Sequence, residues 1–200
     1  GRPQTAQRLA AAMRIVAGKC RGRQIAAPKG RATRPTTDRV RENLFNVLEN
    51  RISFEGIRVL DLFAGSGALG LEALSRGAAH CVFVESANAA RAVIQANLET
   101  LGLMASSQIL KRDAARLGVA GTLPPFDLVF ADPPYGKGLG DAAAQSLVDG
   151  GWLNPGALVS IEESKDSQIA APEELILIDR RLYGASEISL FEYQPGSHIS

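Results

Sequence analysis

The feature that most constrains the fold is a strand, a glycine-rich turn and a helix that follow one another within residues 58–75. Residues 58–63 (RVLDLF) form the apolar run that a strand buried on both faces requires. The run ends in Ala64-Gly65-Ser66-Gly67, and sequence compatible with a helix follows over residues 68–75. A strand that turns directly into a helix is the repeating unit of a parallel sheet, so this segment predicts an α/β fold.

The alternation of strands and helices continues to residue 162, and two strand-like runs joined at Gly184 close the chain. Alternation predicts parallel strands with helices on both faces, and the closing pair predicts an antiparallel hairpin at one edge. We therefore expect a seven-stranded, mostly parallel sheet. Its strands are expected at residues 58–63, 80–85, 108–111, 126–131, 157–162, 175–183 and 187–193, and its later helices at residues 68–75, 88–101 and 139–148.

The first quarter of the chain has a different pattern. Residues 14–27 place a basic stretch between two short β-type runs, which predicts a small hairpin. A loop rich in proline, glycine and arginine follows, and Thr36-Thr37-Asp38 is typical of the start of a helix. The apolar faces are expected to be Val40, Leu44, Val47 and Leu48 in this helix, and Ala89, Val93, Ala96 and Leu101 in the helix at residues 88–101.

Charge and pattern together divide the chain. We expect residues 1–12 to be a tag or a disordered start, because a patterned segment begins at Met13. Residues 1–51 carry 12 Lys or Arg against three Asp or Glu, a net +9, whereas residues 52–200 carry a net −8. Concentrated positive charge favours docking of a polyanion, although a solvated basic arm has the same composition. We therefore separate a basic extension over residues 13–51, which is suited to contact a polyanion such as RNA, from a second domain over residues 52–200.

The two cysteines indicate a reducing compartment. Cys20 and Cys81 lie far apart, which is neither a disulfide framework nor a metal-ligand spacing. Cys81 lies inside a strand-like run and is expected to be a core thiol. No apolar run approaches the ~20 residues that a membrane span needs. We expect a cytoplasmic protein without a metal site.

The turn at Gly65 and Gly67 is a candidate cofactor site. Its spacing alone fits a nicotinamide dinucleotide, S-adenosylmethionine or a tight turn that binds nothing. Asp61 favours S-adenosylmethionine, because a carboxylate attracts the methionyl ammonium through water and repels a pyrophosphate. Glu85, at the end of the next strand, suits the ribose hydroxyls of either cofactor. Asp113 is either the partner of the adenine amine or an ordinary helix cap.

Asp132-Pro133-Pro134-Tyr135 follows the strand at residues 126–131, so it lies at the carboxyl edge of the sheet, where ligands bind in this architecture. These residue types suit methyl transfer to the exocyclic amine of a base, whose lone pair is delocalised into the ring. The Asp132 carboxylate and the Pro133 carbonyl can accept the two amine hydrogens, and proline holds that carbonyl in place beforehand. Tyr135 offers a ring on which a flipped base can stack. The alternative is a proline-rich turn without function.

These residues also carry a resemblance to a known family. Residues 34–42 (RPTTDRVRE), residues 61–78 (DLFAGSGALGLEALSRGA), the Asp-Pro-Pro-Tyr motif and residues 150–153 (GGWL) resemble the bacterial small-subunit ribosomal RNA guanine-N2 methyltransferases of RsmD type. Residues 14–25 (RIVAGKCRGRQI) resemble the N-terminal hairpin of that family. The resemblance covers nearly all of residues 13–193. Its first two motifs are specific, whereas Asp-Pro-Pro-Tyr is shared with other amino-directed methyltransferases.

The resemblance implies a Rossmann-like class I methyltransferase fold, S-adenosylmethionine as cofactor, and a guanine of 16S rRNA as substrate, within the small ribosomal subunit or its assembly intermediate. We expect a monomer. The candidate catalytic residues are Asp132, Pro133, Pro134 and Tyr135; the candidate cofactor-binding residues are Asp61, Phe63, Gly65, Ser66, Gly67, Glu85, Ser86, Asp113 and Ala114; the candidate RNA-binding residues are Arg21, Arg23, Arg34, Thr37, Arg39 and Arg41.

Three other functions share part of this pattern. A DNA adenine-N6 or cytosine-N4 methyltransferase has the same motif, but 200 residues leave little room for a separate target-recognition domain. A catalytically silent nucleic-acid-binding scaffold would not need Asp61 and Asp132 together with both glycines. A dehydrogenase would need a proton-relay residue at the fourth strand, and none is visible there.

Overall fold

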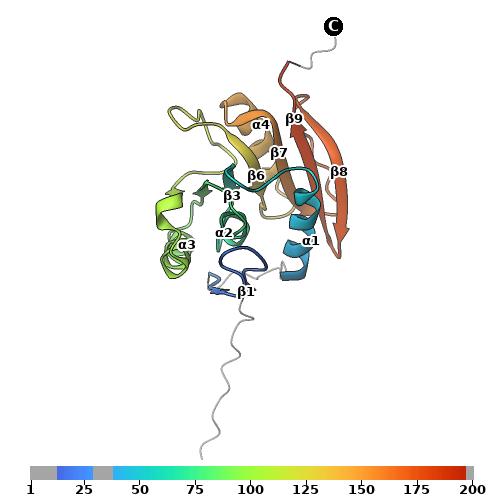
Figure 1. Cartoon of the computed structure of the whole chain (residues 1–200). Coiled ribbons are helices and arrows are strands. Elements are labelled where there is room, and N and C mark those ends of the chain that lie inside the picture. Colours follow the sequence, from blue (N-terminus) through green and yellow to red (C-terminus); the bar gives the residue numbers. More distant parts are fainter. Residues whose placement is uncertain (1–12, 29–37, 197–200) are drawn as a thin grey trace, which may run out of the picture.

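The computed structural model describes residues 13–28 and 38–196. They form a seven-stranded sheet covered on both faces, with a two-stranded sheet at the N-terminal side (Figure 1). The expected start at residues 1–12 and the loop that contains Arg34 and Thr37 lie outside the described residues.

Five parallel strands make up most of the large sheet, in the order β5-β4-β3-β6-β7, and an antiparallel pair, β9 and β8, completes it. The sequence therefore predicted the sheet and its antiparallel edge correctly. The strands are β3 (Arg58–Leu62), β4 (His80–Val84), β5 (Ser107–Leu110), β6 (Phe126–Ala131), β7 (Leu153–Ser164), β8 (Leu175–Tyr183) and β9 (Ser186–Tyr193).

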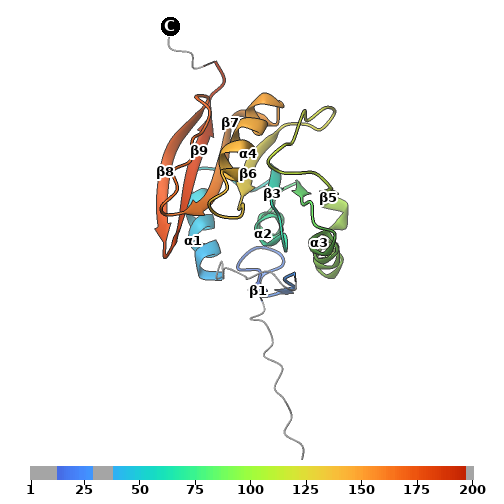
Figure 2. The same cartoon turned by 180° about the vertical axis from the view of Figure 1, so that it is seen from behind.

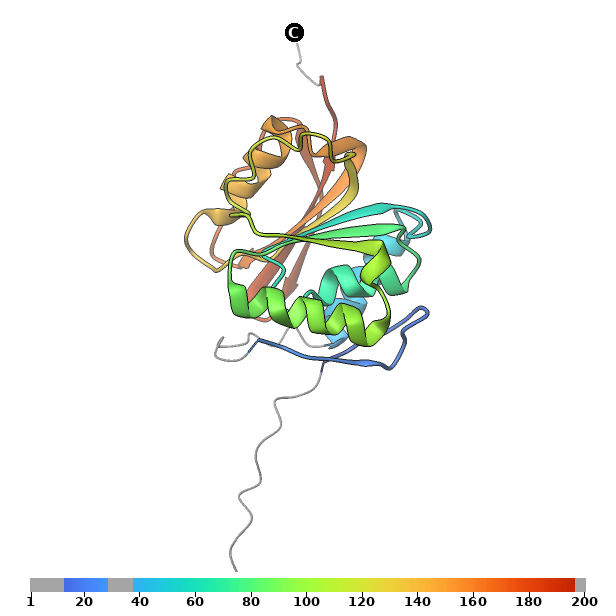
Figure 3. The same ribbon diagram turned by 90° about the vertical axis from the view of Figure 1, so that its left-hand side faces the viewer.

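Helices cover the two faces unequally. α1 (Asp38–Glu49), α2 (Ala68–Ser75) and α3 (Asn88–Leu101) contribute to the buried cluster on one face. α4 (Leu139–Asp149) contributes to the cluster on the other face, together with the buried Trp152. Figures 2 and 3 show these layers from behind and from the side. A short 3-10 turn, Met104–Ser106, joins α3 to β5.

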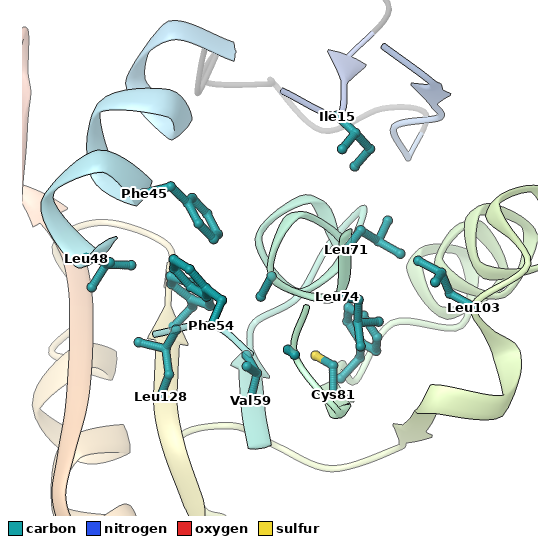
Figure 4. Close-up of a cluster of buried hydrophobic side chains, with 14 of the residues drawn as sticks. Ile15, Phe45, Leu48, Phe54, Val59, Leu71, Leu74, Cys81, Leu103 and Leu128 are labelled. Carbon is teal, nitrogen blue, oxygen red and sulfur yellow. The ribbon is translucent and has the colours of Figure 1, made fainter. Parts of the chain in front are cut away.

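The predicted N-terminal hairpin is present, and it is fastened to the helices α2 and α3 by hydrogen bonds. Its strands, β1 (Met13–Arg14) and β2 (Gln24–Ile25), pair antiparallel. Ile15 is buried in the same cluster as Phe45 of α1 and Leu71 of α2 (Figure 4). Ile25 belongs to this cluster as well. The basic extension therefore shares its core with the face of the sheet that α2 covers.

The predicted Leu44, Leu48 and Leu101 are buried, but the rest of the buried faces of α1 and α3 differs from the prediction by about one residue. α1 buries Phe45 rather than Val47, and α3 buries its Ala90 and Ile94 side rather than its Ala89 and Val93 side. In both helices the buried face contains a polar residue, Arg41 in α1 and Asn97 in α3. Apolar periodicity alone does not identify such a face, because the buried polar side chain interrupts the apolar pattern.

No helix among residues 13–28 and 38–196 is long and apolar enough to cross a bilayer.

Candidate functional site

The candidate site lies where the strand order reverses. β3 is followed in sequence by β4 and β5 on one side, whereas β6 and β7 lie on its other side. Leu62 of β3 is in register with Ala131 of β6, so the turns that follow these two strands emerge side by side at the carboxyl edge. Open α/β sheets bind their ligands in the crevice at such a point. We call residues 63–67 the glycine loop and residues 132–138 the proline loop.

The glycine loop is sharply curved. Gly65 and Gly67 have φ angles of 58° and 79°, in the left-handed region that glycine adopts without a steric penalty. Phe63 also has a positive φ, of 54°, which is strained for a residue with a side chain. The Gly70 N–H donates to the carboxylate of buried Asp61 at 3.0 Å and so ties the start of α2 back to β3.

Glu85 holds the opposite side of the glycine loop. It follows β4, is buried, and accepts a hydrogen bond from the Gly65 N–H at 2.9 Å. Its other carboxylate oxygen accepts from the Ala87 N–H, also at 2.9 Å, at the start of α3. The intervening Ser86 is exposed. The backbone therefore fixes this carboxylate beside the loop before any ligand arrives.

The site is acidic. Burial raises the pKa of Asp61 well above its usual range; the hydrogen bond from Gly70 lowers it, and the charges of Asp132 and Glu85 raise it further. Asp132 and Glu85 therefore lie close enough to Asp61 for their charges to repel its carboxylate. A cationic ligand would relieve this repulsion, whereas a pyrophosphate would add to it. The electrostatics thus fit a sulfonium cofactor better than a dinucleotide.

Asp113 and Ala114 follow β5. The exposed Asp113 accepts a hydrogen bond from the Ala115 N–H at 2.9 Å, but residues 114–115 form a turn and not a helix, so the expected helix cap is a turn cap instead. Ala114 is buried against the core. A contact of Asp113 with adenine stays a prediction.

The proline loop is anchored from β7. Asp132 and Tyr135 are half-buried, Pro133 is buried and Pro134 is exposed. The Tyr135 hydroxyl donates to Glu162 Oε1 at 3.0 Å. The Gly136 N–H donates to Glu163 Oε1 at 3.1 Å.

Sequence reasoning missed Glu162 and Glu163 as parts of the site. A signal was available, because both stand at the carboxyl end of the strand that follows β6 in sequence and in the sheet. Polar residues at that end of a buried strand belong to the edge where ligands bind.

The candidate RNA-binding residues of the hairpin lie away from the two loops. Arg21 and Arg23 are exposed on the turn between β1 and β2. That turn contacts the far ends of two helices: Lys19 N–H donates to the Ser75 carbonyl at the end of α2, and Arg23 Nη2 donates to the Thr100 carbonyl near the end of α3 (Figure 3). The hairpin thus runs along the molecule toward the amino edge of the sheet.

Arg39 and Arg41 are only two residues apart, but their surroundings are opposite. Arg39 is exposed at the start of α1 and stays a candidate for phosphate contact. Arg41 is only 1% exposed, and its guanidinium donates to Glu72 at 3.3 Å and to Asp38 at 2.9 Å. The prediction that Arg41 binds RNA is therefore wrong, because the side chain is sequestered in an internal ion pair. Arg34 and Thr37 lie outside the described residues.

Glu72 explains why Arg41 is held inside. This fully buried carboxylate on α2 also accepts from the N–H groups of Val16 and Ala17, at 2.8 and 3.1 Å, and from Arg76. A buried charge is tolerated only when it is paired and hydrogen-bonded. Glu72 therefore fastens the hairpin and α1 to the helix that begins at the glycine loop.

Neither cysteine belongs to the site. Cys81 is fully buried in the core, as predicted, and Cys20 is buried under the hairpin. Within residues 13–28 and 38–196, no three His, Cys, Asp or Glu side chains gather in a way that could hold a metal ion.

Comparison with known proteins places this geometry among methyltransferases. A family described as "conserved hypothetical protein 95" matches residues 13–192. "Putative rRNA methyltransferase YlbH" of Bacillus subtilis (strain 168) is 36% identical over 185 residues, which cover 90% of this chain and 98% of that protein. "Ribosomal RNA small subunit methyltransferase D" of Escherichia coli (strain K12) is 41% identical over 155 residues, 78% of this chain and 76% of that protein.

The solved structures agree. "Putative methyltransferase yhhF from Escherichia coli" superposes with a TM-score of 0.78 at 34% identity, over 92% of this chain and 98% of that chain. The predicted Rossmann-like class I methyltransferase fold is therefore confirmed.

Proposed function

The chain belongs to the family described as "conserved hypothetical protein 95", and on that premise we propose that it methylates the exocyclic N2 amine of a guanine in 16S rRNA, with S-adenosylmethionine as cofactor. The relatives named ribosomal RNA small subunit methyltransferase D support ribosomal RNA as the substrate class. The choice of guanine N2 rests on the motif resemblance and on the chemistry of the proline loop.

The residues present fit the cofactor. S-adenosylmethionine, when bound, supplies a methyl group activated by its positive sulfur. Asp61 and Glu85 lie on the two sides of the glycine loop, where their carboxylates would attract the ammonium and accept from the ribose hydroxyls, respectively. The other candidate cofactor-binding residues are Phe63, Gly65, Ser66, Gly67, Ser86, Asp113 and Ala114.

The observation that carries the proposal is the closeness of the two loops. The charge of Asp132 raises the pKa of Asp61, so the carboxylate of the proline loop lies within electrostatic reach of the glycine loop. The register of β3, β6 and β7 also places Asp61, Asp132 and Glu162 on one face of the sheet. A base held by the proline loop would therefore present its amine toward the cofactor.

The proline loop suits an aromatic amine as acceptor of the methyl group. Asp132 and the Pro133 carbonyl would each accept one amine hydrogen and so localise the nitrogen lone pair toward the methyl group. Pro133 and Pro134 restrict the backbone, so the two acceptors are in place before the base arrives. Tyr135 would stack on the flipped base, a contact worth ~1–3 kcal/mol.

The RNA surface would consist of Arg21, Arg23, Arg34, Thr37 and Arg39. Arg21 and Arg39 are exposed on different elements of one extension, so a folded RNA could contact both. Charge reversal at Arg39 tests this surface, because loss of a phosphate contact weakens binding more at low salt than at high salt. We expect a monomer that acts on the small ribosomal subunit or on its assembly intermediate.

The experiment incubates the protein and methyl-labelled S-adenosylmethionine with small subunits from cells that lack this modification. Labelled N2-methylguanosine in the digested 16S rRNA is the expected product. Transfer to DNA adenine or cytosine alone would replace the proposal with DNA methylation. Absence of S-adenosylhomocysteine binding in a calorimeter would instead favour a non-catalytic scaffold.

A further inference from the structure

We propose that Glu162 is a positioning residue that holds the Tyr135 ring in the orientation that receives the target base. This inference rests on the proposed function, because it concerns the ring on which the base is expected to stack. Glu162 acts through Tyr135 and is not proposed to touch the base.

The loop that carries Tyr135 has little backbone restraint after its prolines. Gly136 and Gly138 both have positive φ angles, of 75° and 65°, and residues 136–138 are exposed. An added Cβ at either glycine would meet no atom within 4 Å, so packing does not hold this part of the loop. Hydrogen bonds rather than packing therefore restrain the part of the loop that directly follows Tyr135.

Two consecutive carboxylates of β7 supply those hydrogen bonds. Glu162 accepts from the Tyr135 hydroxyl at 3.0 Å, and Glu163 accepts from the Gly136 N–H at 3.1 Å. Neighbouring residues of a strand point to opposite faces, so the loop is held from two directions. Glu163 fixes the backbone of the loop, whereas Glu162 fixes the far end of the aromatic ring.

The support beneath Glu162 is rigid. β7 is an inner strand that pairs with β6 through Ile161 and with β9 through Glu162 itself. Glu162 is only 9% exposed. A hydroxyl bound to a fixed carboxylate is restrained in direction, and such charge-assisted bonds are stronger than neutral ones.

The strand register places Glu162 next to Asp132. Ala131 is paired with Ile161, so the next residues, Asp132 and Glu162, lie beside each other on the same face. The carboxylate that would hold the amine and the carboxylate that holds the ring are therefore neighbours. A tethered ring would keep the stacked base in the plane that brings its amine to Asp132, and preorganisation of this kind acts on the chemical step.

A double-mutant cycle in the methylation assay tests the inference. Tyr135→Phe keeps the ring and removes its tether, and Glu162→Ala removes the partner. Each is expected to lower kcat about tenfold, the size of one charge-assisted hydrogen bond, with the KM for S-adenosylmethionine unchanged. The double variant should be no slower than either single variant. Glu162→Gln keeps an acceptor oxygen and should recover most of the rate.

Matched controls separate positioning from folding. Tyr193→Phe removes a half-buried hydroxyl from β9, and Glu187→Gln removes a carboxylate that pairs with Arg180. Both should leave kcat unchanged, and all variants should keep their affinity for S-adenosylhomocysteine. Additive losses in the double variant, or full activity of Tyr135→Phe, would overturn the inference. A wild-type protein that does not methylate small subunits would instead refute the proposed function on which the inference rests.

Discussion

The glycine loop and the proline loop leave adjacent strands at the same edge of the sheet, and each is braced by two carboxylates. Glu85 accepts from the backbone N–H groups of Gly65 and Ala87, and Asp61 accepts from the Gly70 N–H in the first turn of α2, directly after the glycine loop. One brace of the proline loop is a side-chain contact, from Tyr135 to Glu162. The glycine loop and the first turn of α2 also border the core, because a Cβ added at Gly67 or at Gly70 would lie 3.1 Å or 2.4 Å from Phe83 Cε1.

This difference indicates a division of labour. A loop held through its backbone and against the core is preformed, which suits a small cofactor that every catalytic cycle uses. A loop with exposed glycines and a tethered ring can admit a base and then orient it. The two loops should therefore respond differently to substitution: changes beside the glycine loop should alter cofactor binding, and changes in the proline loop should alter turnover.

The largest expected effect belongs to the proline loop. Asp132→Ala should lower kcat by at least about a hundredfold, because it removes the acceptor that we propose for the reacting amine. S-adenosylhomocysteine affinity, measured by calorimetry, should stay within about threefold of wild type, well below the tenfold that 1.4 kcal/mol represents. A variant with normal turnover would mean that another group holds the amine.

The corresponding change beside the glycine loop, Glu85→Ala, should weaken cofactor binding. Glu85→Ala leaves the Gly65 and Ala87 N–H groups without their partner and removes the acceptor proposed for the ribose. The dissociation constant for S-adenosylhomocysteine should rise by about ten- to a hundredfold, the range of hydrogen bonds to a charged group. The KM for the RNA should not change. An equal rise in the dissociation constant for S-adenosylhomocysteine and in the KM for the RNA would show that the two loops are not independent.

Added methyl groups should reveal how tightly the proline loop and the first turn of α2, into which the glycine loop leads, are packed. A Cβ at Gly70 would lie 2.4 Å from Phe83 Cε1 and 2.7 Å from Cys81 Sγ, so Gly70→Ala should cost about 2 kcal/mol of unfolding free energy through overpacking. Gly136→Ala meets open space and should cost only about 1 kcal/mol, from its positive φ. Denaturant unfolding measures both. A larger cost at Gly136 would reverse the proposed difference between the loops.

The smallest expected effect is a dependence of the unfolding free energy on pH. The folded-state pKa of Asp61 is raised, chiefly by burial, above the unfolded value of about 3.9. The native protein without cofactor therefore binds more protons than the unfolded chain between these two values, and its unfolding free energy should fall as the pH rises through that window. Asp61→Asn keeps an acceptor for the Gly70 N–H and should remove this slope. Parallel pH profiles for the two proteins would show that Asp61 titrates normally.

Cofactor affinity should depend on pH with the opposite sign. Ionised Asp61 attracts a cation, so S-adenosylmethionine should bind more tightly as the pH rises through the folded pKa of Asp61, and Asp61→Asn should abolish this trend. The proline-loop variant Tyr135→Phe is the matched control and should keep it.

The sequence predicted the sheet and both loops because their signals are local. Apolar runs that end in Gly-Ser-Gly or in Asp-Pro-Pro-Tyr identify strand ends, and parallel topology brings those ends to one edge. The role of Arg41 could not be predicted, because its partner Glu72 is remote in sequence and looks like an ordinary helix residue. The place of Glu162 and Glu163 at the end of a buried strand was visible in the sequence, but their partners, Tyr135 and Gly136, were not, because these contacts form only once β6 and β7 are adjacent.

The most direct test of methyl transfer at this edge is mass spectrometry of 16S rRNA digested to nucleosides, from cells that have the protein, lack it, or carry only Asp132→Ala. One N2-methylguanosine should be present with the wild-type protein and absent in the other two strains. The same modification in all three strains, or its return with Asp132→Ala, would contradict the assignment of the amine to the proline loop.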